Sequence, residues 1–230
     1  MTSTPSFSVA LSDAVSYMHL LPNESVDLII TDPAYESLEK YRAIGTTTRL
    51  KEEWFPIFHK YRFVEWFAGA YRVLRKDRHL YMFCDAETMF VAKSIGEAAG
   101  FKFWKPLVWD KVNIGMGYHY RNRYEFVLFF EKGSRQLADL GVADIITCKR
   151  VRGSYPTEKP VEVASVLVSQ SAQPGETVLD TFCGSGALLE AAVRHGCDAR
   201  GCDVVDKAVT LTRERLSAAG GVEARMGLLA

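Results

Sequence analysis

The 230-residue sequence has no net charge, no Cys-x-x-Cys pair and no long apolar run. Its 28 Lys+Arg residues balance 28 Asp+Glu residues, which argues against a polybasic nucleic-acid binder. The five cysteines are scattered and odd in number, which is typical of a reducing compartment and indicates no metal site. No apolar run reaches the roughly 18 residues of a membrane span, and residues 1–8 lack the apolar core of a signal peptide. We therefore expect an intracellular, cytoplasmic protein without membrane association.

The order of apolar patterns indicates the fold class. With 48% hydrophobic residues, the chain can form one large α/β domain, which we expect to span residues 1–230. The expected strands are residues 7–11, 26–31, 79–84, 103–110, 124–130, 144–148, 177–180 and 199–202. The expected helices are residues 13–21, 54–74, 86–99, 157–170 (with Thr157 as cap) and 187–195. This alternation predicts a doubly wound, mostly parallel, Rossmann-like sheet.

The motif Asp32-Pro33-Ala34-Tyr35 directly follows the β-branched run at residues 26–31. That run predicts a buried strand whose carboxyl end leads into a loop, at the edge where open α/β sheets bind ligands. A carboxylate, a fixed carbonyl and an aromatic ring in this place suit a planar amine, because two acceptors meet its N–H groups and the ring stacks on it. The same residues are also typical of an Asp-Pro turn that ends a strand.

A second motif joins the expected strand 177–180 to the loop Thr-Phe-Cys-Gly-Ser-Gly at residues 181–186 and then to a helix. Backbone can approach a nucleotide closely at such a loop. Asp203 lies 23 positions after Asp180 at the end of the next strand, where a carboxylate accepts both ribose hydroxyls. The loop lacks the Lys-Ser/Thr ending of polyphosphate sites and the third glycine of the dinucleotide fingerprint, which disfavours ATP hydrolysis and a nicotinamide-dependent oxidoreductase. S-adenosyl-L-methionine carries a ribose without phosphate and suits the motif; an ordinary βαβ crossover is the alternative.

Three segments carry a family resemblance. Residues 32–35 resemble the catalytic Asp-Pro-Pro-Tyr motif of the amino-group DNA methyltransferases, and residues 180–186 resemble their Phe-x-Gly-x-Gly motif. Between them, Tyr-Pro-Thr-Glu-Lys-Pro at residues 155–160 is similar to the His-Pro-Thr-Gln/Glu-Lys-Pro segment of the β-ordered group. Placing the catalytic motif first and the cofactor motif last is the circularly permuted order of that group. The resemblance implies a class I S-adenosyl-L-methionine-dependent methyltransferase fold with a small inserted recognition element.

The resemblance also implies roles for particular residues. The expected catalytic residues are Asp32 and Pro33, whose carboxylate and carbonyl accept from the target amine, and Tyr35, which stacks on the extruded base. The residues expected to bind the cofactor are Asp32, Thr157, Lys159, Asp180, Phe182, Cys183, Gly184, Gly186 and Asp203, with Asp203 at the ribose and Thr157 and Lys159 near the methionine end. The chain departs from the family in two places. Ala34 replaces the usual second proline, which makes the loop less rigid, and Tyr155 stands where the family often has His.

The identity of the modified base follows only from the resemblance. In the family, Asp at the first motif position goes mostly with N6-adenine and Ser mostly with N4-cytosine, so Asp32 points to adenine in DNA. N4-cytosine methylation is the near alternative, and an RNA substrate is a more distant one. A catalytically silent nucleic-acid-binding module of the same fold is the alternative from another class.

Contacts with double-stranded DNA are expected from loops beside the site. The expected contact residues are Arg42, Arg49, Tyr118, His119 and Arg121. Residues 36–51 are polar and Gly/Thr-rich, and we expect a mobile loop near the active site; residues 132–155 are the candidate target-recognition insertion. Each basic cluster taken singly is equally typical of a solvated surface. The resemblance also allows a homodimer and a prokaryotic or phage-like source.

Overall fold

The computed structural model describes residues 4–36, 56–115, 119–151, 155 and 157–224. Within these residues, nine strands form one sheet in the order β6-β4-β5-β3-β2-β7-β8-β1-β9. The strands are β1 (Ser6–Leu11), β2 (Val26–Thr31), β3 (Leu74–Cys84), β4 (Lys102–Asp110), β5 (Tyr124–Lys132), β6 (Ile145–Thr147), β7 (Thr177–Asp180), β8 (Asp198–Asp203) and β9 (Val222–Glu223). The helices are α1 (Ala14–Leu20), the 3-10 turn η2 (Lys60–Arg62), α3 (Phe63–Val73), α4 (Ala86–Ala98), α5 (Val161–Ser171), α6 (Ala187–Arg194) and α7 (Asp206–Ala218).

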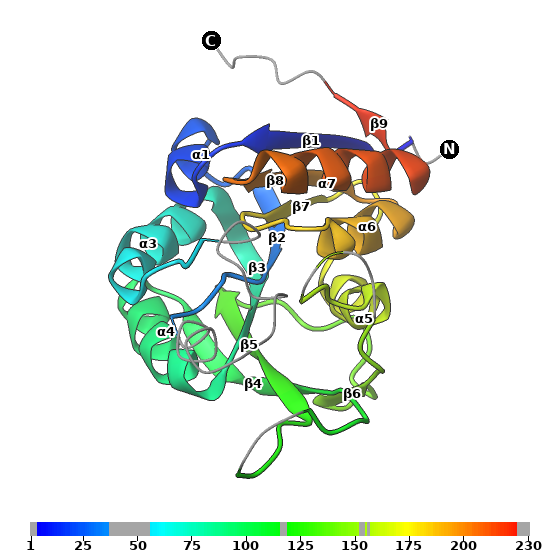
Figure 1. Ribbon diagram of the computed structural model, residues 1–230. Helices are drawn as coiled ribbons and strands as arrows, with labels where there is room; N and C mark the ends of the chain where they lie inside the picture. Colours follow the sequence, from blue (N-terminus) through cyan, green and yellow to red (C-terminus); the bar gives the residue numbers. More distant parts are fainter. Residues whose placement is uncertain (1–3, 37–55, 116–118, 152–154, 156, 225–230) are drawn as a thin grey trace.

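The sheet is covered by helices on both faces (Figure 1), with α1, α3 and α4 on one side and α5, α6 and α7 on the other. Each face has its own apolar core. Leu28 and Ile30 of β2 belong to the core under α5 and α6, whereas Ile29 belongs to the core under α1 and α3. Every residue of β2 is buried, which explains why its apolar residues do not alternate with exposed polar ones; the buried Asp27 is paired with Arg75 and Arg78. Among the described residues, no helix has the length and apolarity that crossing a membrane requires.

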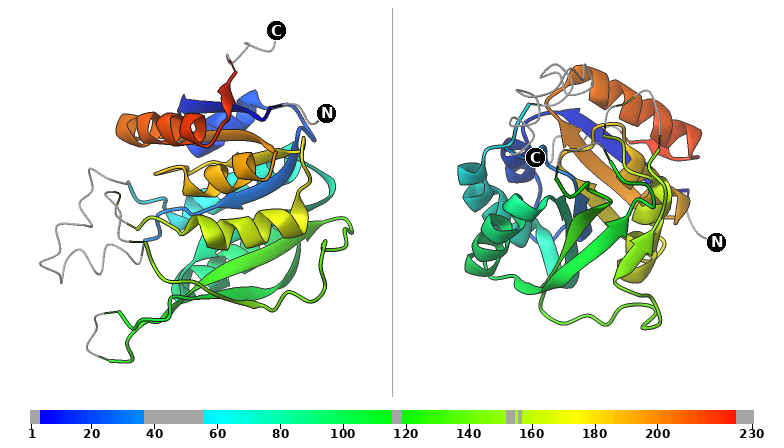
Figure 2. Two further views of the ribbon diagram at one scale, coloured as in Figure 1. Left: turned by 90° about the vertical axis from the view of Figure 1, so that its right-hand side faces the viewer. Right: turned by 60° about the horizontal axis from the view of Figure 1, so that its bottom comes forward.

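Strand pairing is mostly parallel, as the sequence predicted. β2 runs parallel to β3 and β7, and β8 runs parallel to β7 and β1. β5 is the reversed strand, antiparallel to both β3 and β4. The amino-terminal end of β5 therefore reaches the edge where β2, β3 and β7 have their carboxyl ends. Figure 2 shows the twisted sheet between its helical layers and the β4–β5 hairpin, which extends away from the body of the domain.

In the sheet, β2 has two neighbours: β3, the next strand along the chain, lies on one side, and β7, a strand from much later in the chain, lies on the other. The strand order thus changes direction between β2 and β7, and a crevice at such a switch point is where open α/β sheets bind ligands. A buried hydrogen bond of 2.7 Å from Thr31 Oγ1 to Asp180 Oδ1 joins the last residues of the two strands. The fold therefore places the two sequence motifs side by side.

Three local expectations were wrong. The strand expected at residues 79–84 begins five residues earlier, at Leu74. The helix expected over residues 54–74 begins only at Phe63, after η2, and ends at Val73 because β3 starts at the next residue. Thr157 does not cap α5: its φ is +63°, and Pro160 is the capping residue. Pro160 has an extended φ and ψ of −63° and 133°, so the three residues before it form an irregular segment and not a first helical turn. The structure also contains α7 and β9, for which the sequence analysis made no prediction.

Candidate active site

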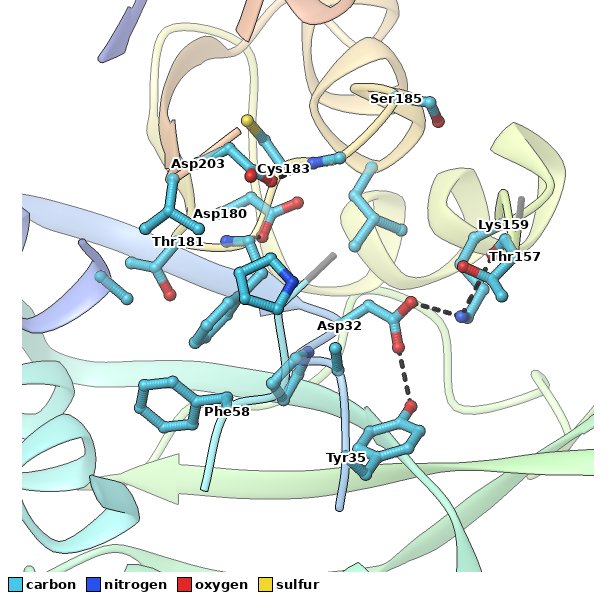
Figure 3. Close-up of a pocket in the computed structure, with 18 of the residues that line it drawn as sticks. Asp32, Tyr35, Phe58, Thr157, Lys159, Asp180, Thr181, Cys183, Ser185 and Asp203 are labelled. Atoms are coloured by element: carbon cyan, nitrogen blue, oxygen red, sulfur yellow. Dashed lines mark hydrogen bonds and ion pairs between the residues drawn. The ribbon is translucent and has the colours of Figure 1, made fainter. Parts of the chain in front are cut away.

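A cavity of about 390 Å³ lies at the carboxyl ends of β2, β7 and β8. Its walls come from parts of the chain that are distant in sequence: the start of α1, the loop after β2, the segment after residue 55, the start of β5, the residues before α5, the glycine loop after β7 with the start of α6, and the end of β8. Figure 3 shows several of the side chains around it, with Asp32 at the centre. The size of the cavity is in the range of pockets that hold small molecules.

The Asp32 carboxylate is held on both of its oxygens. Tyr35 Oη donates to Oδ1 at 2.7 Å, and the Lys159 ammonium donates to Oδ2 (Figure 3). Burial raises the pKa of Asp32 above its usual value, and the neighbouring Lys159 charge opposes that rise. The cation therefore favours the ionised carboxylate, which is the form that accepts hydrogen bonds on both oxygens.

A second acid and a second base continue this ion pair. Glu125, the second residue of β5, has Oε2 at 3.4 Å from Lys159 Nζ and Oε1 at 2.5 Å from Lys111 Nζ. Burial acts to raise the pKa of Glu125, but the two ammonium groups outweigh it and hold this pKa below its usual value. The pKa of Lys159 is raised by Asp32 and Glu125, against the effect of burial. Lys111, Glu125, Lys159 and Asp32 thus form a row of alternating charges with no net charge.

Asp180 lies deeper in the same cavity and has no ammonium or guanidinium partner among the described residues. It is fully buried; its Oδ1 accepts from Thr31 and from the backbone N–H of Phe182 at 3.0 Å, whereas its Oδ2 has no hydrogen-bond partner in the described part of the chain. Burial raises its pKa to about 7, because the charged form loses its hydration. The next residue, Thr181, accepts a hydrogen bond of 2.9 Å from the buried Trp66 indole, which ties this loop to α3.

The glycine loop is closed by Asp203. Its Oδ2 accepts from Gly184 N at 2.9 Å and its Oδ1 accepts from Val205 N at 2.9 Å. Gly184 has φ +50°, and a Cβ there would lie 3.3 Å from the Tyr155 ring, so a side chain would enter the cradle between them. Gly186 has φ +81°, and a Cβ would lie 3.0 Å from Thr212. Both positions therefore require glycine for conformation and for space.

The structure brings together most of the residues expected from the sequence. The predicted site residues that line the cavity are Asp32, Pro33, Tyr35, Thr157, Lys159, Asp180, Phe182, Cys183, Gly184 and Asp203. Gly186 is the N-cap residue that precedes α6 and does not line the cavity. His119 and Arg121 are exposed and do not line it either; Arg121 Nε donates to Gly115 O at 2.7 Å. Arg42, Arg49 and Tyr118 lie outside the described residues, as does almost all of the loop expected at 36–51.

Sequence reasoning missed Glu125, Phe58 and Glu158, which also line the cavity. One signal for Glu125 was present in the sequence: it is the single acid in the apolar run from Tyr124 to Phe130, and an acid that enters the sheet in this way needs a partner. Phe58 carried no such signal. Its ring packs edge-on against Phe182, with ring centroids 4.9 Å apart, and only the tertiary structure brings the two together.

The donor and acceptor set of the cavity fits S-adenosyl-L-methionine. The Asp180 Oδ2 that has no partner among the described residues, the side-chain-free backbone at Gly184 and the Asp203 carboxylate at the end of β8 suit an adenosine group with a free ribose diol. The side of the cavity that Asp180 and Asp203 line is acidic, and the described residues place no cluster of basic side chains there. This agrees with a ligand that lacks phosphate.

The fold and this cavity define a class of protein: a doubly wound α/β domain with a nucleoside-type ligand site at the switch point of its sheet. The model of the DNA methylase family matches residues 26–214, and the chain belongs to this family. The resemblance inferred from the three motifs is therefore confirmed.

Individual proteins show the same similarity. YubD of Escherichia coli K12 is 28% identical over 90% of this chain and 88% of its own length. The DNA adenine methyltransferase YhdJ of the same organism is 24% identical over 90% of this chain and 81% of its own. Among solved structures, TTHA0409 of Thermus thermophilus in complex with S-adenosyl-L-methionine has a TM-score of 0.71 at 19% identity, covering 95% of this chain and 98% of that one. The cytosine-N4-specific PvuII DNA methyltransferase has a TM-score of 0.72 at 13% identity, covering 96% and 95%. These structures confirm the predicted fold, and the predicted cofactor agrees with the TTHA0409 complex.

Proposed function

We propose that this DNA methylase transfers a methyl group from S-adenosyl-L-methionine to the exocyclic N6 amine of adenine in double-stranded DNA. The observation that carries the proposal is the position of the Asp32 carboxylate. It lies in the same cavity as Asp180, Gly184 and Asp203, so an amine held by Asp32 and a nucleoside cofactor held by the glycine loop would be adjacent.

The chemistry required of the protein is modest. The amine is a poor nucleophile because its lone pair is delocalised into the ring, and the cofactor supplies an electrophilic methyl group on a sulfonium. Asp32 and the carbonyl of Pro33 accept from the two N–H bonds and so favour a pyramidal nitrogen with its lone pair free. An in-line displacement of this kind depends on positioning and electrostatics more than on acid–base strength. The proton that the amine loses leaves through Asp32 or water.

The target base must leave the duplex before Asp32 can reach its amine, at a cost of a few kcal/mol. We propose that Tyr35 stacks on the extruded base and offsets part of that cost. The Tyr35 ring lines the cavity, and its hydroxyl is bound to Asp32, so the stacking surface and the acceptor are held at a fixed relation to one another. Burial raises the pKa of Tyr35 well above its usual value, which keeps the hydroxyl protonated as a donor.

Adenine is preferred over cytosine because Asp, and not Ser, occupies position 32. N4-cytosine is the second candidate, and one observation favours it: the cytosine-specific PvuII enzyme shares the fold over nearly all of this chain. An exocyclic amine beside a ring nitrogen is common to both bases, so the described cavity accommodates either reaction.

The DNA-contacting surface is proposed at the same end of the domain. The segment after β5 returns to the sheet as the edge strand β6, which pairs with β4 and is followed by the exposed Lys149 and Arg150. We propose that this segment, within residues 132–155, reads the target sequence, with His119 and Arg121 of the β4–β5 hairpin on the phosphates. Positive side chains in such positions provide the salt-dependent part of DNA affinity.

The test is transfer of labelled methyl from S-adenosyl-L-methionine to mixed-sequence duplex DNA, followed by digestion and nucleoside chromatography. The wild type should place label in N6-methyladenine, and Asp32→Ala and Asp32→Asn should lose it. Label in N4-methylcytosine would replace the adenine proposal by the second candidate. Cofactor binding without transfer to DNA, tested beside a single-stranded RNA pool, would refute the proposed function.

A further inference from the structure

We propose that Glu125, supported by Lys111, is a positioning residue for methyl transfer that acts by holding the Lys159 ammonium against Asp32. The inference rests on the proposed function, because it concerns the residue that would accept the target amine. Glu125 belongs to none of the three motifs, and its position in the site comes from the reversal of β5.

The geometry places Lys159 between two acids. Its ammonium bonds Asp32 Oδ2 on one side and lies 3.4 Å from Glu125 Oε2 on the other, above the Phe83 ring at 5.5 Å from the ring centroid. Asp32 follows β2 and Glu125 is the second residue of β5, and β3, which ends at Cys84, lies between these two strands. Lys159 thus spans the end of β3 and links the acids on either side of it.

A lysine needs such a second anchor. Its ammonium sits on a flexible four-carbon stem and, with Asp32 as sole partner, could meet that carboxylate from several directions. The attraction of Glu125 restricts these directions. Asp32 is then held by Lys159 at Oδ2 and by Tyr35 at Oδ1, which fixes the plane of a carboxylate whose terminal torsion is otherwise broad. A fixed acceptor plane is what an in-line transfer requires.

The Lys111 ammonium favours the ionised form of the Glu125 carboxylate beside the cavity. This ammonium is 2.5 Å from Glu125 Oε1 and 5.2 Å from the centroid of the Trp109 ring, and only 11% of the Lys111 side chain is exposed. Trp109 is also the residue opposite Glu125 in the β4–β5 pairing. The Glu125 oxygen that faces Lys159 has no hydrogen-bond partner within the described residues. A buried ion pair is weak evidence for stability, because apolar side chains of similar volume often stabilise a protein as well. A row of charges that ends on the acceptor carboxylate therefore points to function.

Three variants are compared with the wild type: Glu125→Gln, Lys159→Met and the double variant. For each, one assay measures kcat for methyl transfer to duplex DNA, and calorimetry measures the Kd for S-adenosyl-L-methionine. Glu131→Gln is the matched control, because Glu131 is a buried acid on the same strand that bonds Trp104 and the Arg135 backbone. We expect Glu125→Gln to lower kcat about 10- to 100-fold with less than about a threefold change in Kd, and Glu131→Gln to leave both unchanged. In the Lys159→Met background, Glu125→Gln should have no further effect on kcat, since it acts through the lysine.

Two results would overturn the inference. One is a kcat for Glu125→Gln within about twofold of the wild type; the other is a fall in kcat on adding Glu125→Gln to Lys159→Met that equals its fall in the wild type. Circular dichroism melting of each variant shows whether it folds; if Glu125→Gln does not, Lys111→Met is the second variant, with an expected fall in kcat of about three- to tenfold at unchanged Kd. An unchanged kcat for that variant would also count against the inference. The wild type run in parallel keeps the two proposals apart: a wild type that transfers no methyl group refutes the proposed function, and the positioning role falls with it.

Discussion

Replacing Asp180 by Asn should make the protein more stable, by an amount that grows as the pH rises from about 4 to about 7. Asp180 is fully buried, accepts hydrogen bonds from Thr31 and from Phe182 N on one oxygen, and has no partner for the other among the described residues. Asn keeps the shape and an acceptor oxygen for both donors. It removes the charge, which is the feature that burial penalises.

The expected magnitude follows from the pKa. Burial raises the pKa of Asp180 from 3.8 to about 7. Below pH 3.8 the carboxyl is protonated in both folded and unfolded states, so its contribution to stability is fully present. Between pH 3.8 and 7 only the folded state keeps the proton, so the free energy of unfolding falls by about 1.4 kcal/mol per pH unit as the pH rises. At pH 8 the wild type has lost about 4 kcal/mol that the Asn variant does not lose.

Urea unfolding of both proteins at pH 4, 6 and 8 measures this difference. The two curves should nearly coincide at pH 4 and separate progressively, with the variant more stable at pH 8. Thr31→Val is the companion variant: it removes a hydrogen bond that lowers the pKa of Asp180, so the loss of stability should continue to higher pH than in the wild type and reach a larger total. A stability difference between Asp180→Asn and wild type that is the same at all three pH values would refute the reasoning.

Three further predictions concern other parts of the structure. Gly184→Ala should weaken S-adenosyl-L-methionine binding about tenfold or more by calorimetry, because the added Cβ lies 3.3 Å from the Tyr155 ring and φ is +50°. His79 is buried between Ser171 Oγ and a backbone carbonyl, and burial lowers its pKa below 6.5. The stability that neutral His79 contributes is therefore present above pH 6.5 and lost as the pH falls. Urea unfolding between pH 5 and 7 measures this loss. Trp66→Phe should cost about 1–3 kcal/mol of unfolding free energy, because the buried Thr181 hydroxyl loses its donor.

Each of these predictions has a control. Gly175→Ala also places a Cβ at positive φ but with no atom within 4 Å, so it should leave cofactor binding unchanged; equal weakening by both variants would contradict the steric argument. His79→Gln should flatten the pH dependence between pH 5 and 7, and a wild-type slope that persists in this variant would assign it to other groups. In a Thr181→Val background, Trp66→Phe should cost clearly less than in the wild type, and equal costs would show that the hydrogen bond contributes nothing.

The local sequence was sufficient for the elements and for the two ends of the site. Buried parallel strands are short apolar runs, and residues 26–31 and 177–180 were predicted with the bounds that β2 and β7 have. Motif residues follow these strands directly, so Asp32 and Asp180 had to lie at the carboxyl edge once the sheet was parallel. The glycine loop itself was expected, but only Gly184 of the two predicted glycines lines the cavity, and the positive φ of both is known only from the structure.

The sequence was a poorer guide where local patterns compete. Residues 54–74 show helical spacing throughout, yet α3 begins at Phe63, since a 3-10 turn over residues 60–62 precedes it. The Thr-Glu-Lys-Pro run looked like a helix start with Thr157 as cap. The proline instead caps α5, because the residue before a proline avoids the helical conformation.

Only the tertiary structure decided how the acceptor is held. Nothing near Asp32 in the sequence shows that its oxygens bond Tyr35 and Lys159, and nothing indicates that Glu125 stands behind the lysine. The contact between Glu125 and Lys159 depends on β5 running opposite to its neighbours, which brings the first residues of β5 to the edge where β2 ends. The sequence by itself determined which groups are available for the chemistry, because their identity and their place after a strand are local properties. Their charges and orientations depend on burial and on partners up to 149 positions away, and these exist only in the folded chain.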